Sequence, residues 1–108
     1  MAVTTSELLT HAEHARDAGD LALAAGLYQR AALEGSAEAY GELGLILLGM
    51  GDSAYAETAF QRAAEAGHGL GYYGLGRLRM AEGDAERAEN LYRRAAEAGV
   101  TRPATAEC

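Results

Sequence analysis

Residues 28–32 read Tyr-Gln-Arg-Ala-Ala, and this pentapeptide returns at residues 60–64 as Phe-Gln-Arg-Ala-Ala and at residues 92–96 as Tyr-Arg-Arg-Ala-Ala. Successive copies are 32 residues apart. A fixed period of this length is typical of repeat proteins, in which each supersecondary unit buries its apolar face against its neighbours. The sequence therefore predicts three copies of one structural unit.

Glycines divide these units at regular intervals. They recur every 16 residues, at positions 19, 35, 51, 67, 83 and 99. Aspartate follows every second one, namely Gly19, Gly51 and Gly83. Glycine adopts the left-handed conformation that commonly ends a helix. The segments between the glycines are rich in Ala, Leu, Glu and Arg, which favour helix. Val and Ile together contribute three residues, so few strand formers are present.

Capping residues locate the helix starts. Thr4 and Glu7 fit a capping box, Ser36 fits an N-cap, and an aspartate follows each of the alternate glycines. We expect helices over 6–17, 21–34, 37–49, 53–66, 69–81 and 85–98. Because the connections are short, neighbouring helices should be antiparallel. The predicted fold is all-α, with three stacked helical hairpins.

The segment 69–81 contains Gly71, Gly74 and Gly76 within its predicted helix. Each glycine costs roughly 0.8–1 kcal/mol relative to alanine in a helix interior. Two interpretations remain open. The glycines could allow close packing against adjacent helices, or they could leave a bare strip of backbone for a partner.

Composition limits the classes of function. The chain has 108 residues and a formal net charge of −7, from nine arginines, no lysine and 16 acidic residues. This balance argues against nucleic acid and anionic membrane surfaces as partners. The sequence has no apolar run long enough to span a bilayer and no recognisable signal peptide, so we expect a soluble cytoplasmic protein. The single cysteine, Cys108, excludes an internal disulfide.

The repeated pattern resembles the tetratricopeptide repeat, W-x2-L-G-x2-Y followed by A-x3-F. The second unit has Tyr40, Leu43, Gly44, Leu47, Ala56 and Phe60 at these positions; the third has Tyr72, Leu75, Gly76, Arg79, Ala88 and Tyr92; the first has the degenerate set Leu8, His11, Ala12, Ala15, Ala24 and Tyr28. The resemblance covers about residues 5–99. Two features depart from the family pattern: the period is 32 instead of 34, and Gly35-Ser36 and Gly67-His68 replace the usual Asp-Pro between units. The Ala-Ala-Glu-Ala-Gly-His junction at residues 63–68 resembles the related Sel-like repeat.

This resemblance implies a right-handed α-solenoid of three helix-turn-helix repeats, with a repeat domain over residues 1–99 and a flexible tail over 100–108. It also implies a protein-interaction scaffold without catalysis or cofactor, which binds a protein or peptide in a concave groove. The groove positions carried over from the family are Leu9, Glu13, Glu38, Glu42, Leu45, Leu48, Leu70, Tyr73, Arg77 and Met80. An apolar strip flanked by Glu38, Glu42 and Arg77 would suit a partner with apolar anchors and some basic character.

Other functions have weaker support in the sequence. Weak self-assembly could use the last helix, where no further helix covers Leu91 and Tyr92. Cys108 could be a point of modification. Glu7, His11 and His14 share one helical face, but this spacing and the lack of a fourth ligand favour a solvated helix over a metal site. The serines lie near predicted helix starts, where capping accounts for them, and we find no catalytic set.

Overall fold

The computed structural model describes residues 3–100, and this part of the chain forms six α-helices of 13 residues each. They are α1 (Thr5–Asp17), α2 (Leu21–Leu33), α3 (Ala37–Gly49), α4 (Ser53–Glu65), α5 (Gly69–Ala81) and α6 (Ala85–Glu97). Each predicted boundary is confirmed to within one residue. The predicted tail, including Cys108, lies outside the described residues from position 101 onward.

Glycine ends every helix through a left-handed turn. The six glycines of the 16-residue series all have positive φ, between +78° and +99°. After α3, the Gly51 amide donates to the Leu48 carbonyl (3.0 Å) and the Asp52 amide donates to the Leu47 carbonyl (2.9 Å). These bonds satisfy carbonyls that the helix leaves open. The turn then delivers the chain directly to the next N-cap.

The predicted caps begin the helices. Thr4 and Glu7 form a complete capping box, in which each side chain accepts from the other residue's backbone amide. Asp20, Asp52, Asp84 and Ser36 each accept a hydrogen bond from the amide three residues later. His68 caps α5 differently, because its Nδ1 accepts from the Leu70 amide at 3.2 Å.

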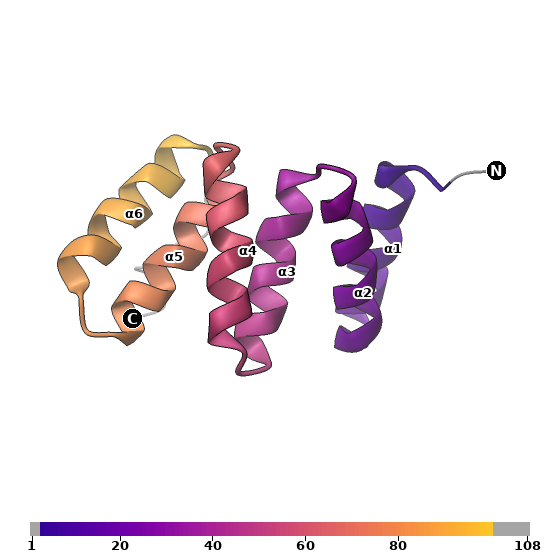
Figure 1. Ribbon diagram of the computed structural model, residues 1–108, viewed down its shortest axis with the longest axis horizontal. Coiled ribbons are helices and arrows are strands. Elements are labelled where there is room, and N and C mark those ends of the chain that lie inside the picture. Colours follow the sequence, from indigo (N-terminus) through magenta and orange to yellow (C-terminus); the bar gives the residue numbers. More distant parts are fainter. Residues whose placement is uncertain (1–2, 101–108) are drawn as a thin grey trace.

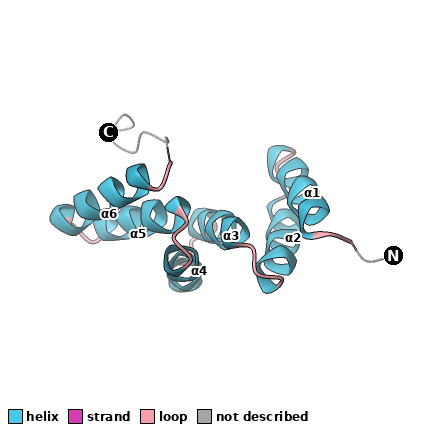
Figure 2. Ribbon diagram, turned by 90° about the horizontal axis from the view of Figure 1, so that it is seen from above, coloured by secondary structure: helices cyan, strands magenta, loops and turns pink. Residues whose placement is uncertain are grey.

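The helices pack in chain order into an elongated stack of 48 × 24 × 23 Å (Figure 1). Each helix contacts the next, and α3 also packs against α5. Figure 2 shows α2 and α4 on the same side of α3. The buried side chains form successive clusters, one around Leu8 and Tyr28 and another around Phe60 and Leu78. Each repeat therefore contributes to a core shared with its neighbour, as in an α-solenoid.

Phe60 of α4 occupies a slot between two glycines. It is fully buried, and its ring lies against Gly44 of α3 and Gly74 of α5. A Cβ at position 44 would lie 2.5 Å from Phe60 Cε1, and a Cβ at position 74 would also meet the ring. At Gly71 a Cβ would meet the α4 backbone at Phe60 and Ala64. The close-packing interpretation of the α5 glycines is thus confirmed.

Among the described helices, none has the length and apolar character needed to cross a membrane.

Candidate functional site

The ten predicted groove residues lie on α1, α3 and α5, the first helices of the three repeats. We call the surface along these three helices the first-helix groove. Five of the ten are half-buried: Leu9, Glu13, Glu38, Leu45 and Leu48. Arg77 and Met80 are exposed. These seven side chains offer surface to a partner.

The other three predicted residues are buried, with exposed fractions of 8% for Glu42, 7% for Leu70 and 5% for Tyr73. Leu70 and Tyr73 therefore do not line an open groove as expected, whereas Glu42 borders the hollow described below. Leu70 packs on α3, where a Cβ at Gly41 would lie 2.6 Å from its own Cβ. Tyr73 packs against the ring of Tyr92 on α6, with centroids 6.0 Å apart. Both side chains are buried in contacts between helices because α5 lies so close to its neighbours.

Glu42 joins the first two repeats through Arg16. Arg16 Nη1 donates to Glu42 Oε2 at 3.0 Å and to the Tyr28 hydroxyl at 3.2 Å. The three residues come from α1, α2 and α3, so this network ties the first hairpin to the second repeat. α1 shows no packing on α3 comparable to that of α3 on α5, which makes the ion pair a main link between α1 and α3.

The pairing of Arg16 with Glu42 was not predicted from the sequence, although a signal was present. Arg16 occupies the repeat position held by Leu48 and Met80, and Glu42 occupies the position held by Thr10 and Gly74. A cation and an anion thus depart from the repeat pattern at adjoining positions of the same junction. Between the second and third repeats, Gly74 occupies the position that Glu42 holds between the first and second, and the ring of Phe60 lies against it.

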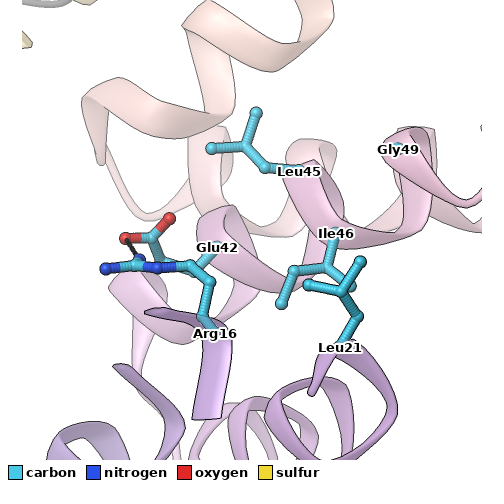
Figure 3. Close-up of a pocket in the computed structure, with 6 residues that line it drawn as sticks. All are labelled: Arg16, Leu21, Glu42, Leu45, Ile46 and Gly49. Atoms are coloured by element: carbon cyan, nitrogen blue, oxygen red, sulfur yellow. Dashed lines mark hydrogen bonds and ion pairs between the residues drawn. The ribbon is translucent and has the colours of Figure 1, made fainter. Parts of the chain in front are cut away.

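A hollow of about 280 Å³ opens beside this network (Figure 3). Arg16 and Glu42 face each other at one end, Leu21 lies beside Ile46, and Leu45 and Gly49 complete the lining. Polar groups at one end and apolar side chains at the other are suited to one anchored side chain of a partner. Leu45 was predicted to be a groove residue, whereas Leu21 and Ile46 were not.

The electrostatic environment of the network is acidic. Burial raises the pKa of Tyr28 to about 12, with a further increase from Glu42 that Arg16 partly offsets. The negative charges of Glu13 and Glu38 raise the pKa of the same hydroxyl further. The pKa of Arg16 is raised, because the hydroxyl and carboxylates around it outweigh the opposing effect of its burial.

The candidate metal ligands of α1 do not converge. Glu7 hydrogen-bonds to Thr4 in the capping box, and hydrogen bonding to Thr4 lowers the pKa of its carboxyl. His11 exerts only a weaker influence on this group. Within residues 3–100 no three His, Cys, Asp or Glu side chains are grouped so that they could hold a metal ion.

Comparisons with known proteins identify the fold. No protein-family model matches the chain, and no curated protein matches its sequence. The chain is similar to the crystal structure of MamA, with a TM-score of 0.73 and 21% sequence identity over 88% of this chain. The match covers 58% of the MamA chain, so the present sequence spans little more than half of that protein. The likeness agrees with the packing described above, and the chain has the all-α fold of a helical-repeat solenoid.

Proposed function

We propose that this chain is a tetratricopeptide-like, Sel-like interaction module that holds a protein or peptide partner in the first-helix groove and performs no catalysis. The helical-repeat fold supports this proposal, because stacked repeats present an extended, preorganised surface. The observation that carries it is the hollow beside Leu45, where an apolar pocket adjoins a fixed ion pair. A rigid site lowers the ordering cost of binding.

The charge of the surface supports a partner with basic character. Glu13 and Glu38 are half-buried, and neither forms an ion pair within the part of the chain that the structure describes. Glu42, in contrast, is engaged by Arg16. Two carboxylates therefore remain to meet a partner's Arg or Lys beside an apolar anchor. Such contacts affect mainly the association rate and specificity and weaken with salt.

A peptide selection tests this function. A phage-displayed library of random peptides is selected on the immobilised full chain, and enriched peptides are synthesised with a fluorescent label for anisotropy titration. We expect enriched peptides to combine apolar residues with Arg or Lys. Leu45→Ala should weaken their binding about tenfold, and Glu13→Gln with Glu38→Gln should weaken it at low salt.

The matched control keeps the charge change and moves it elsewhere. Glu65→Gln with Glu97→Gln removes two carboxylates from exposed positions of α4 and α6. This control should bind the peptides as the unchanged chain does. If both double variants lose the same affinity for the peptides, the effect comes from the net charge of the chain and not from the groove. If Leu45→Ala leaves peptide binding unchanged, the groove assignment is wrong.

End-to-end self-assembly has less support. Continuing the stack would place α1 against the outer face of another copy's α6, as α5 lies against α4. The position of Gly71, where even a Cβ would meet backbone, is held in α1 by Glu7. A glutamate side chain would clash in a contact as close as that of α5 on α4, so α1 is poorly suited to pack in this way on another copy's α6.

A further inference from the structure

A second groove lies on the other side of α3, between α2 and α4. Its volume is about 500 Å³, within the range of ligand pockets. Tyr40, Leu43 and Leu47 of α3 form its floor, and Leu33 and Tyr55 stand at its walls. Leu33 is 76% exposed and Tyr55 is 70% exposed, although both are large and apolar. None of its lining residues is charged. We call this surface the α2–α4 groove.

The next repeat junction shows that this apolar character is not demanded by the fold. Thirty-two residues later, Ala25, Leu33, Leu47 and Tyr55 correspond to Glu57, Glu65, Arg79 and Arg87. Arg79 donates to Glu57 at 2.7 Å, so an ion pair spans the corresponding floor. The same backbone arrangement thus accommodates charged side chains at these four positions. Structural need does not explain the exposed Leu33 and Tyr55.

One arginine lies next to the groove toward the C-terminal end of α4. Arg62 follows Thr58 by four residues and Ala59 by three, so it lies beside two lining residues on its helix. Arg62 is exposed and forms no ion pair within residues 3–100. Glu34 is directed to α1, where it accepts from the Thr5 hydroxyl at 2.6 Å.

We propose that the α2–α4 groove is a second binding site, which takes an amphipathic segment of a partner protein with apolar anchors and an acidic residue. The anchors enter between Leu33 and Tyr55, and the carboxylate meets Arg62. The net charge of −7 does not prevent this contact. At physiological salt, screening limits the range of charge–charge interactions to about 8 Å, so the charges next to the groove matter most.

A second copy of the chain is a poorer occupant. In a two-fold contact the same patch is used by both copies, which would bring the Arg62 of each copy to one interface. Each copy also carries the same net charge of −7. The volume of the groove accommodates side chains rather than a domain surface. These features favour a segment of another protein.

The decisive variant gives the first junction the residues of the second. Leu33→Glu with Tyr55→Arg introduces the residue types that the chain carries at positions 65 and 87, keeps the net charge, and changes only exposed side chains. Its control is Leu23→Glu with Met50→Arg, which introduces the same two charged residue types at exposed apolar positions away from the groove. Circular dichroism and urea unfolding establish that both variants are folded.

The probes are labelled peptides from random-library selection on the full chain, measured by fluorescence anisotropy. We expect a class of enriched peptides with two apolar residues three or four positions apart and a nearby Asp or Glu. Their affinity should fall about tenfold or more in the groove variant, stay unchanged in the control, and fall in Arg62→Gln. Glu13→Gln with Glu38→Gln should leave it unchanged, which separates this site from the first-helix groove.

Three results would overturn the proposal. One is that selection yields no peptide class sensitive to Leu33→Glu with Tyr55→Arg. Another is that the acidic peptides lose binding only in Leu45→Ala, which would assign them to the first-helix groove. The last is a concentration-dependent dimer in sedimentation that the groove variant abolishes, which would make a second copy the occupant.

Discussion

The ring of Phe60 occupies the space that a side chain at position 74 would need. Gly74 therefore allows α4 and α5 to approach each other with an aromatic ring between them. Glycine lowers the helix propensity of α5 at this position, but its lack of a side chain permits the close interhelical contact. The same ring also lies against Gly44, so Phe60 links α3, α4 and α5 in one packing unit.

Gly74→Ala is expected to destabilise the chain. The added Cβ would enter the Phe60 ring, and overpacking of this kind costs about 1–3 kcal/mol, which exceeds the propensity gain of about 0.8–1 kcal/mol. Gly26→Ala on α2 is the control, because a Cβ there meets nothing within 4 Å. Urea unfolding should show a lower midpoint for the first variant and a higher midpoint for the second. Two shifts of the same sign would contradict this account of α5.

Gly51→Ala and Gly49→Ala should change stability in opposite directions. Gly51 has φ of +86°, whereas Gly49 is helical, and both have open space around the Cβ position. Alanine in the left-handed conformation costs roughly 1–2 kcal/mol. Alanine at a helical position gains up to about 1 kcal/mol, and less at the last turn. Thermal unfolding of the pair isolates backbone conformation from packing, and a stabilised Gly51→Ala variant would refute the glycine-turn argument.

Arg16→Met should destabilise the junction between the first two repeats. It removes the arginine from a carboxylate that is largely buried, a loss we expect to cost roughly 1–3 kcal/mol. Arg16→Met with Glu42→Met should be less destabilising than the sum of the single variants, because the buried charge is removed as well. Arg93→Met is the control, since its pair with Glu89 is exposed on α6 and should matter by less than about 1 kcal/mol. Additive costs at 16 and 42 would argue against direct coupling.

Alkaline pH should weaken the fold through Tyr28. The pKa of its hydroxyl is about 12 in the folded chain and 10.0 in its ordinary state. The folded state therefore retains the proton longer, and the associated stability is complete below pH 10 and is lost as the pH rises toward 12. Urea midpoints across this range should fall less steeply for Tyr28→Phe than for the unchanged chain. Tyr55→Phe, at an exposed tyrosine, should keep the original slope.

Local physics allowed the helices to be predicted from sequence. Gly51 ends a helix because of its own backbone freedom, and Thr4 begins one through a hydrogen bond to an amide three residues away. Such effects act within one turn, so the pattern fixed helix boundaries to within a residue. The 32-residue period indicated the stack, since equivalent helices must bury equivalent faces.

The binding surfaces depended on distances that the repeat pattern does not contain. Leu70 and Tyr73 are buried because Gly41 and the ring of Tyr92 lie close to them in the folded chain. Glu42 is withdrawn from the surface by Arg16, which is 26 residues away in sequence. The periodicity of a helix determines which side chains share a face, whereas the approach of neighbouring helices determines which of them meet solvent. The sequence by itself therefore determined the six helices and their order, and only the tertiary structure decided that an apolar groove opens between α2 and α4.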